Sequence, residues 1–472
     1  MIIDKHHSPG TLDHSVCFDQ DLIERYGGRG PRYTSYPTAL QFDESFTAAD
    51  YARHAKASNE DGRPLSLYVH IPFCESLCYY CACNKIVTRN AERVESYLGH
   101  LYQEITMQSE LFDRDRLVKQ LHFGGGTPTY LDSGQMCSLF AHLRNSFTFD
   151  DSEQREFSIE VDPRTVNSES MSLLAELGFN RLSLGVQDFD LQVQTAVNRI
   201  QSADDVASLM EDARQNHFKS VSFDLIYGLP HQSVETFDRT LDQVLEMRPD
   251  RLAIYNYAHL PARFKGQRMI NDHDIPLPAT KLDILRHTIA KLADSDYIYI
   301  GMDHFALPDD DLVIAQENGT LQRNFQGYST HGECDLIGLG VSAIGSIGNA
   351  YSQNSTSTKE YEEVLSNDSL PVKRGIEIDQ DDTLRGKVIQ ELMCYDRLTF
   401  SDFEEEHGIE FKSYFLRELE RLEPLAKDGL VQIDDEQISI TAKGRLLLRS
   451  IAMVFDRYLT ADDDSNRFSK AI

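Results

Sequence analysis

The sequence predicts an α/β fold with a parallel sheet, preceded by an N-terminal arm and followed by a mostly helical C-terminal domain. Apolar, strand-like runs alternate with helical segments six times between residues 65 and 257. Strands that alternate with helices indicate βαβ units and a parallel sheet. Six such units form either an open sheet or an incomplete barrel, and right-handed crossovers favour a barrel-like curl.

The predicted elements follow from short apolar runs and from the helical periodicity between them. The strands are expected at Leu65–Ile71, Val118–Phe123, Glu156–Val161, Arg181–Val186, Ser220–Tyr227 and Arg251–Tyr257. Helices are expected at Asn90–Leu111, Ser168–Leu177, Ala203–Gln215 and Val234–Met247. Beyond residue 290 we expect one more strand at Tyr297–Phe305, glycine-rich loops near a ligand at Asn324–Thr330 and Ile337–Ser346, and a short hairpin within Leu430–Ile440.

These elements divide the chain into four predicted segments. Residues 1–58 form an arm, because glycine and proline interrupt Gly27–Thr38. Residues 59–295 form the core, and residues 296–364 form a core extension that carries the substrate and cofactor loops. Residues 365–472 form the mostly helical domain, for which we expect a winged-helix arrangement that serves as a lid or scaffold.

Composition narrows the setting and the partners. The chain of 472 residues carries a net charge of −30, which disfavours nucleic acid and anionic membrane surfaces. No apolar run reaches the ~18 residues of a membrane-spanning helix, and the N-terminus lacks the features of a secretory signal. We therefore expect a cytoplasmic protein whose cysteines bind metal or act in catalysis rather than form disulfides.

Polar residues and glycines gather where the predicted strands end. Cys74 follows the first strand, Gly124–Thr127 the second, Glu160 and Asp162 the third, and Gln187 the fourth. Active sites of α/β barrels and doubly wound sheets lie at the carboxyl ends of their strands. These side chains are therefore expected to converge on one site.

Four cysteines lie in one short loop after the first strand. Cys74, Cys78 and Cys81 have the spacing C-x3-C-x2-C, and Cys83 follows two residues later. Thiolates select iron–sulfur clusters, copper(I) or zinc. A structural zinc site usually takes four ligands in two separated pairs, so a single tight loop of three favours an iron–sulfur cluster with one iron left open.

The cysteine loop together with Gly124–Pro128 resembles the radical S-adenosylmethionine (SAM) superfamily. That resemblance implies an incomplete parallel (β/α)6 barrel of the radical SAM type. It also implies one 4Fe-4S cluster held by Cys74, Cys78 and Cys81, whose open iron binds the methionyl end of the cofactor. In this superfamily an electron from the cluster cleaves the sulfonium and yields a 5′-deoxyadenosyl radical. Glycine suits the turn because the backbone must approach the ligand without a Cβ.

Further segments are similar to the oxygen-independent coproporphyrinogen III oxidase family, also called coproporphyrinogen dehydrogenase. They are spread over nearly the whole chain and comprise Pro31–Thr38, Leu67–Cys74, Cys81–Ile86, Leu184–Asp188, Asp224–Pro230, Asn256–Pro261, Gly301–Phe305 and Asn324–Tyr328. The resemblance implies an oxidoreductase of haem (porphyrin) biosynthesis. Such an enzyme decarboxylates two propionate side chains of coproporphyrinogen III to vinyl groups and gives protoporphyrinogen IX.

The same resemblance implies roles for individual residues and two bound SAM molecules. Tyr68, Gly125, Glu160 and Ile344 are expected to contact the cluster-bound SAM, with Tyr68 and Glu160 also catalytic. The second SAM is expected to contact Gly126, Thr127, Gln187, Arg199, Asp224 and Ala258. Tyr80 is expected to help hold a cofactor near the cluster. Arg199 can pair with a carboxylate, and Asp224 and Glu160 can accept hydrogen bonds from ammonium or hydroxyl groups.

Two other interpretations of the cysteine loop stay open at this point. A haem chaperone of the same superfamily keeps the three cysteines but usually lacks a cysteine at the position of Cys83 and the arm Pro31–Thr38, both of which this chain has. A zinc-stabilised structural protein is the third interpretation. Cys83 is not expected to bind iron, because a fourth ligand would close the cluster.

The remaining partners are only partly specified. An electron donor and an electron acceptor are required, and the resemblance suggests a monomer. Arg29 and Arg32 in the arm are candidates, by charge and position, for contacts with the substrate propionates.

Overall fold

Six neighbouring parallel strands of the central sheet lie in the order in which they follow one another along the chain. The computed structural model describes residues 2–3, 14–459 and 468. Two compact units can be distinguished: a barrel unit, Gln41–Lys281 with Glu333–Ile378, and a terminal unit, Met1–Leu40 with Leu282–Gly332 and Asp379–Ile472. The boundaries at residues 58, 295 and 364 stay predictions.

The barrel unit is an α/β structure whose sheet continues past the six predicted strands. Its principal strands are β3 Leu65–Ile71, β6 Leu117–Gly125, β8 Glu156–Val161, β9 Arg181–Gln187, β10 Ser220–Tyr227, β11 Arg251–Asn256, β16 Asp335–Leu339, β17 Ile344–Ile347, β18 Ala350–Asn354 and β19 Val372–Glu377. Three short strands are β4 Phe73–Cys74, β5 Ile86–Val87 and β7 Thr148–Phe149. Within this unit the strand order is β11-β10-β9-β8-β6-β3-β16-β17-β18-β19, with β7 beside β6.

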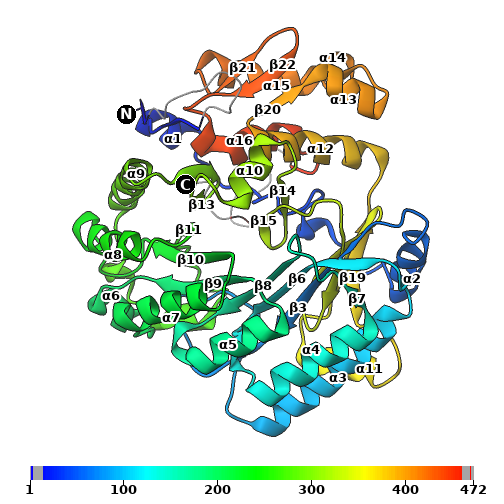
Figure 1. The fold of residues 1–472 in the computed structure, drawn as a ribbon. Coiled ribbons are helices and arrows are strands. Elements are labelled where there is room, and N and C mark those ends of the chain that lie inside the picture. The colour runs from blue at the N-terminus through cyan, green and yellow to red at the C-terminus, as the bar shows by residue number, and fades with distance from the viewer. Residues whose placement is uncertain (1, 4–13, 460–467, 469–472) are drawn as a thin grey trace. The chain divides into compact units, whose positions relative to one another are not determined.

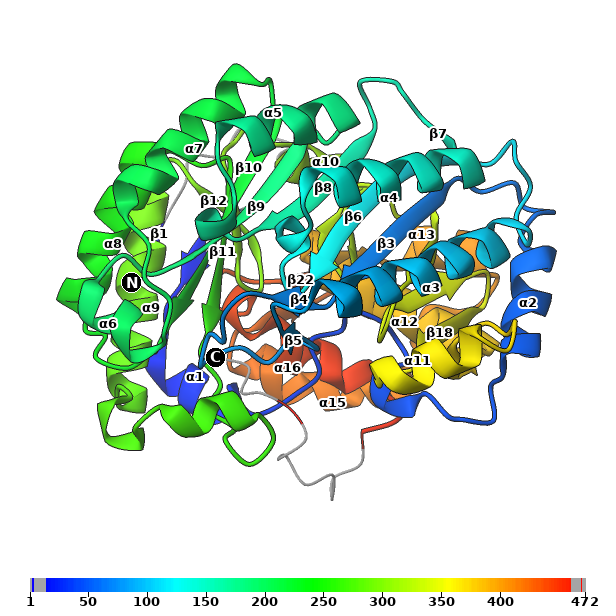
Figure 2. The ribbon, with the colours of Figure 1, turned by 90° about the horizontal axis from the view of Figure 1, so that it is seen from below.

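Parallel pairing runs from β11 to β16, and β17 to β19 are antiparallel. The helices of the unit are α2 Ala48–Ala57, α3 Ala91–Ser109, α4 Ser133–Ser146, α5 Ser168–Leu177, α6 Leu191–Ala196, α7 Ala203–Gln215, α8 Val234–Met247 and α11 Thr358–Leu365. Helix α9 Pro278–Asp294 begins in this unit and lies mostly in the terminal unit. Helices α3, α4, α5 and α7 cover the outer face of the strands (Figure 1). Seen from below, the strands curve as an arc inside these helices (Figure 2). The incomplete parallel barrel is therefore confirmed.

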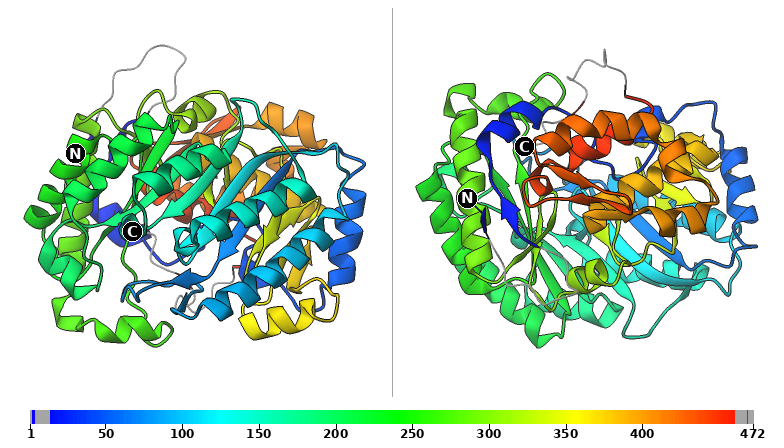
Figure 3. Two further views of the ribbon diagram at one scale, coloured as in Figure 1. Left: turned by 60° about the horizontal axis from the view of Figure 1, so that its bottom comes forward. Right: turned by 90° about the horizontal axis from the view of Figure 1, so that it is seen from above.

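Capping side chains mark the beginnings of the barrel helices. The Asn90 side chain accepts a hydrogen bond from the Arg93 N–H at the start of α3, and Asn167 accepts from Ser170 at the start of α5. Such residues satisfy N–H groups that have no partner inside the helix. The helices lie side by side along the outside of the sheet (Figure 3). Because these caps are local, the predicted helices Ser168–Leu177, Ala203–Gln215 and Val234–Met247 agree with α5, α7 and α8 to the residue.

One segment differs from its prediction. Residues Ile337–Ser346 were expected as a glycine-rich loop, but Ile337–Leu339 lies in β16 and Ile344–Ser346 in β17. A Cβ on Gly338 would lie 2.7 Å from the backbone carbonyl group of Ile344. The glycine therefore allows two strands to approach closely. The prediction of a loop was wrong because glycine also occurs within strands at such close contacts.

Two other predicted features beyond residue 290 are β-hairpins. The single strand expected at Tyr297–Phe305 is the antiparallel pair β12 Ile298–Gly301 and β13 His304–Ala306. The loop expected at Asn324–Thr330 is a hairpin of β14 Gln322–Asn324 and β15 Gly327–Ser329. The hairpin expected within Leu430–Ile440 is confirmed as β21 Val431–Ile433 and β22 Gln437–Ile440.

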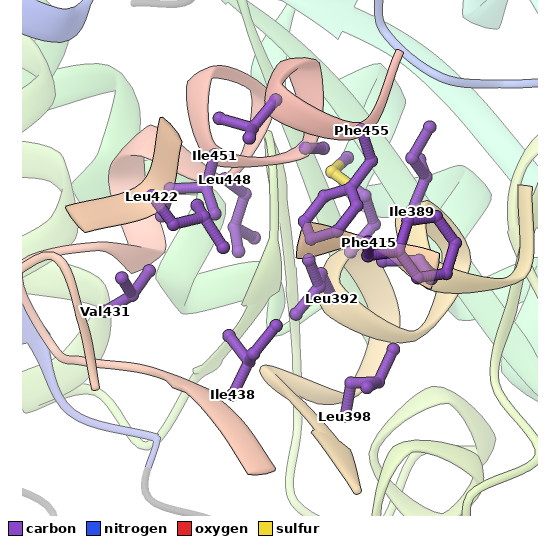
Figure 4. Packing of buried hydrophobic residues seen from close by; sticks show 14 of the residues in the cluster. Ile389, Leu392, Leu398, Phe415, Leu422, Val431, Ile438, Leu448, Ile451 and Phe455 are labelled. Atoms are coloured by element: carbon purple, nitrogen blue, oxygen red, sulfur yellow. The ribbon is translucent and has the colours of Figure 1, made fainter. Parts of the chain in front are cut away.

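The terminal unit is mostly helical with small sheets. Its remaining strands are β1 Ile2–Ile3, β2 Val16–Cys17 and β20 Arg397–Thr399, and β20 joins the hairpin in the order β20-β22-β21. Its helices are α1 Gln20–Tyr26, α10 Asp311–Glu317, α12 Gln380–Tyr395, α13 Phe400–His407, α14 Phe411–Tyr414, α15 Leu416–Lys427 and α16 Leu448–Ala452. The apolar faces of these helices other than α10 meet in one core that includes Ile389, Phe415 and Leu422, all buried (Figure 4). The buried apolar residues of α10 belong to a second cluster that includes Ile300 and Cys394.

Among the described residues, every helix is too short or too polar to cross a membrane.

Candidate active site

A cavity of about 430 Å³ lies at the carboxyl ends of the parallel strands of the barrel unit. Its lining combines the cysteine loop, the glycine-rich turn after β6 and polar side chains from β8, β9 and β10. The strand-end residues Cys74, Gly125, Glu160 and Gln187 all contribute to it. The expectation that these strand ends converge on one site is confirmed for these residues.

Backbone hydrogen bonds hold the cysteine loop in place. Its two ends pair as the parallel strands β4 and β5, with Cys74 opposite Val87. Within the loop, Cys81 N–H donates to the Cys78 carbonyl at 3.2 Å, and Tyr79 N–H donates to the Val197 carbonyl at 3.0 Å. Loops carry binding residues effectively when a rigid scaffold positions them, and the sheet does so here.

The three predicted ligands face the cavity together, and each of their sulfurs accepts a hydrogen bond. Cys74 and Cys78 are buried, and Cys81 is half-buried. The Thr127 hydroxyl donates to Cys74 Sγ at 3.5 Å, and Arg199 Nη1 donates to Cys78 Sγ at 3.5 Å. Three adjacent thiols with polar donors at their sulfurs fit a 4Fe-4S cluster, because thiolates ligate such clusters and hydrogen bonds to sulfur stabilise them.

Cys83 lines the same cavity and contacts Cys81. The hydrogen bond from the Cys83 thiol, together with the charge of Lys85, outweighs the opposing effect of burial and lowers the pKa of Cys81. A lowered pKa favours the thiolate, which is the form that binds metal. Cys83 thus acts on Cys81 as a hydrogen-bond donor in this arrangement.

The glycine-rich turn requires glycine at two successive positions. Gly125 has a φ of +118°, and a Cβ there would lie 2.7 Å from the His70 ring. A Cβ on Gly126 would lie 2.7 Å from the Pro72 backbone carbonyl group. The turn therefore packs directly on the chain that leads into the cysteine loop, where no side chain fits.

Tyr68, His70 and Glu160 form a polar group beside this turn. His70 Nε2 lies 3.0 Å from the Asn84 carbonyl oxygen and must carry the proton, so Nδ1 accepts from the Tyr68 hydroxyl at 3.1 Å. Burial lowers the pKa of His70, which favours this neutral form. Glu160 Oε2 accepts from the Gly125 N–H at 3.1 Å, and Oε1 lies 3.4 Å from His122 Nε2.

A bulge directs Gln187 at the end of β9. The pairing of β10 with β9 shifts register between Asp224 and Leu225, and Gln187 has a φ of +67°. A positive φ is strained for a residue other than glycine and is often found at functional sites. The register shift thus adds one residue on β9 and sets Gln187 on the cavity wall.

Comparison with known proteins gives a consistent picture. Residues 68–244 match the family model of the radical SAM superfamily, and residues 378–447 match that of the HemN C-terminal domain. The oxygen-independent coproporphyrinogen III oxidase of Pseudomonas aeruginosa is 52% identical over 97% of this chain and 99% of its own length. The protein of that name from Escherichia coli is 50% identical over 97% and 99%. The solved structure of HemN from Escherichia coli, described as a radical SAM enzyme, superposes with a TM-score of 0.90 at 49% identity and covers 94% of this chain and 100% of that one.

The chain belongs to the oxygen-independent coproporphyrinogen III oxidase family.

Membership of this oxidase family also indicates which cofactors the chain uses. Its radical SAM domain implies a 4Fe-4S cluster and S-adenosylmethionine. The cysteine loop and the glycine-rich turn both lie in the matched region of residues 68–244.

Most of the residues predicted for an oxidase of this family meet at the cavity. Those that line it are Cys74, Cys78, Cys81, Tyr80, Gly125, Gly126, Thr127, Glu160, Gln187, Arg199 and Asp224. Tyr68, Ala258 and Ile344 lie outside the lining. Tyr68 lies beside Gly124, as Glu160 does, and Ile344 begins β17. The exposed Ala258 is tied to Tyr80 because Gln267 Nε2 donates to both backbone carbonyls, at 3.2 Å and 3.0 Å.

Several residues that line the cavity were not predicted from the sequence, including Arg164, Ser183 and Tyr255. Ser183 could have been found, because it shares the inward-facing alternation of Gly185 and Gln187 along β9. Arg164 comes two residues after Asp162, which directly follows the third predicted strand, and this position was the only feature of the sequence that pointed to the cavity. In the terminal unit, the candidates Arg32 and Arg29 contact the Asp303 carboxylate and the Phe468 carbonyl, respectively.

Proposed function

We propose that this chain oxidatively decarboxylates two propionate side chains of coproporphyrinogen III to vinyl groups and so forms protoporphyrinogen IX in haem biosynthesis. The observation that carries the proposal is the single cavity shared by three cysteines, the glycine-rich turn and Glu160. Family membership over nearly the whole chain supports the substrate and the reaction.

The cluster and SAM, when bound, supply the electron and the 5′-deoxyadenosyl radical that abstracts hydrogen from the propionate. Cys74, Cys78 and Cys81 would hold the cluster, and Thr127 and Arg199 would stabilise the sulfur charge through their hydrogen bonds. Gly125 and Gly126 would let the methionyl part of SAM approach the backbone. Glu160 would accept from the ammonium group, because it lines the cavity beside the glycine-rich turn and the contacts with the Gly125 N–H and His122 orient its carboxylate.

A second SAM is part of the proposal. Gln187, Arg199 and Asp224 line the side of the cavity formed by β9 and β10, and Ser183 donates to Asp224 at 3.0 Å. These groups offer an amide, a cation and a carboxylate to a zwitterionic ligand with ribose hydroxyls. Tyr80, Gly126, Thr127 and, less directly, Ala258 would complete the two SAM sites, with Tyr68 and Ile344 on the cluster-bound one.

The proposal extends to the setting of the reaction. We place the protein in the cytoplasm as a monomer, with an electron donor and an electron acceptor that are separate molecules. All eight cysteines are free thiols, which agrees with a reducing compartment.

An anaerobic assay with reconstituted protein, coproporphyrinogen III, SAM and a low-potential reductant tests the function. We expect two molecules of carbon dioxide and one of protoporphyrinogen per substrate, since two propionates are converted. Cys78→Ser is expected to abolish cluster assembly and turnover. The exposed cysteine of α4 provides the matched control, Cys137→Ser, which is expected to keep both.

Three outcomes would contradict the proposal. Cleavage of SAM without decarboxylation would indicate a different radical substrate. Tight haem binding without product would indicate a chaperone. Zinc without sulfide in the anaerobically purified protein would exclude the cluster.

A further inference from the structure

The Cys78 sulfur differs from its neighbours because it accepts N–H groups from two guanidinium side chains. Arg164 Nη2 lies 3.6 Å from Cys78 Sγ, and Arg199 Nη1 lies 3.5 Å from it. Cys74 Sγ accepts instead from the neutral Thr127 hydroxyl. Two cations therefore meet at Cys78, whereas Lys85 is the cation that acts on Cys81.

Asp162 holds both arginines in this position. It caps the turn after β8 and accepts from Arg164 Nε at 2.9 Å and Nη2 at 2.6 Å. Its Oδ2 also accepts from Arg199 Nη1 at 3.0 Å. Two cations and one anion give the group a net charge of +1 beside the sulfur. The Asp162 and Arg199 side chains are 9% and 8% exposed, so water screens this charge only weakly.

The two arginines differ in what else they do. Arg199 Nη2 donates to the Gly185 carbonyl at 2.5 Å, and Arg199 is proposed above as a SAM contact. The guanidinium of Arg164 contacts the Asp162 carboxylate and Cys78 Sγ. Arg164 also lines the cavity, with 25% of its side chain exposed. Arg164 therefore differs from Arg199, because its guanidinium contacts Cys78 Sγ and the Asp162 carboxylate that holds it there.

We propose that Arg164 is a positioning residue that raises the reduction potential of the cluster by donating an N–H to the Cys78 thiolate. The proposal rests on the proposed function, because it requires the cluster at these cysteines. Reduction adds one electron, taken from an external one-electron donor, to the cluster and makes it more negative. Cluster potentials depend on net charge and on hydrogen bonds to the sulfurs. A charge-assisted donor at Cys78 therefore stabilises the reduced state more than the oxidised state.

The test measures the potential of the cluster and does not use turnover. Parent protein, Arg164→Gln and Arg164→Lys are reconstituted anaerobically without SAM. Each is poised with dithionite and mediators, and the reduced cluster is quantified by electron paramagnetic resonance. Arg214→Gln is the matched control, since Arg214 pairs with Asp250 on the outer side of the barrel unit.

At the midpoint potential of the parent, we expect the ratio of reduced to oxidised cluster in Arg164→Gln to fall about tenfold. For a one-electron couple that change equals 59 mV. Arg164→Lys is expected to show a smaller fall, because lysine keeps the charge but loses the planar fork that bonds Asp162 and the sulfur together. Arg214→Gln is expected to match the parent.

An unchanged ratio in Arg164→Gln, with iron and sulfide content equal to the parent, would overturn the proposal. If Arg164→Gln does not retain a cluster, Arg164→Lys decides: a fall supports the proposal and no change overturns it. Failure of this inference is distinct from failure of the proposed function. If the potential is unchanged but the enzyme is active, only the proposed role of Arg164 is wrong. If the parent protein assembles no cluster, the proposed function is wrong.

Discussion

The carboxyl groups of Glu160 and Asp224 line the same cavity, and their pKa values move in opposite directions. Burial raises the pKa of Glu160, but His122 and the Gly125 N–H outweigh burial and lower it overall. Burial and, second, the negative charge of Glu160 raise the pKa of Asp224 to about 7. Two carboxyl groups with divergent environments take different roles at neutral pH. Glu160 stays ionised, whereas Asp224 changes protonation near pH 7.

Asp224→Asn is expected to change how stability depends on pH. The folded pKa of about 7 lies above the usual 3.8, so between these values the folded chain binds a proton that the unfolded chain has lost. This contribution to stability is therefore complete below pH 3.8 and is lost as the pH rises to about 7. Asparagine removes it, with a difference in slope of at most about 1.4 kcal/mol per pH unit.

Denaturant unfolding of the cofactor-free protein at several pH values in this window measures the effect. The exposed carboxylate of Asp151 supplies the control, because Asp151→Asn is expected to leave the slope unchanged. Equal slopes for Asp224→Asn and the parent would show that Asp224 does not hold the extra proton.

Cys83 is expected to tolerate replacement better than Cys81. Cys83→Ser keeps a donor next to Cys81, so the iron and sulfide content should remain near that of the parent. Cys81→Ser removes a predicted thiolate ligand, and assembly of the cluster should fail. Iron and sulfide analysis of anaerobically reconstituted protein distinguishes the two. Loss of the cluster in Cys83→Ser would mean that Cys83 is itself a ligand.

Gly126→Ala is expected to disturb the cysteine loop. The new methyl group would meet the backbone of Pro72 and Phe73 at 2.7–2.8 Å, and backbone cannot move as a flexible side chain does. We expect a loss of about 1–3 kcal/mol in stability, the usual cost of overpacking, together with weaker SAM binding. Calorimetric titration with SAM and denaturant unfolding measure both effects.

Gly99→Ala is the control for Gly126→Ala, because Gly99 is exposed within α3 and a Cβ there meets no atom within 4 Å. Alanine at such a helical position should stabilise the protein by about 1 kcal/mol. If Gly126→Ala behaves as Gly99→Ala does, the turn has room for a side chain and its predicted close approach is wrong.

Arg116 and Asp335 form an ion pair that joins the start of β16 to the chain before β6. Their charged groups lie 2.5 Å apart, with 2% and 3% of the side chains exposed. Arg116→Ala would leave the Asp335 carboxylate buried without its cation, at a cost of about 3–5 kcal/mol. Denaturant unfolding should show this loss. Arg286→Ala, which breaks an exposed pair with Asp283, should cost about 1 kcal/mol or less. Similar losses of stability in both variants would mean that burial does not make the Arg116–Asp335 pair more important for stability than an exposed pair.

Local features of the sequence determined the repeating core and the metal loop. Strands Glu156–Val161 and Ser220–Tyr227 agree with β8 and β10 to the residue, because alternation and flanking caps act over a few neighbours. The spacing of Cys74, Cys78 and Cys81 predicts a metal site for the same reason, since one short loop contains all three predicted ligands. The resemblance of separate motifs to the oxidase family added the reaction and the substrate.

Tertiary structure alone decided the features that depend on distant pairing. β16 pairs with β3, with Asp335 opposite Leu65, some 270 positions earlier in the chain. Without knowledge of that partner strand, the glycines of this region indicate a loop. Gln187 points into the site because of a register shift against β10, and Arg164 reaches Cys78 because Asp162 orients it. Such contacts arise from hydrogen bonds and packing between segments far apart in the chain, which no local pattern of residues encodes.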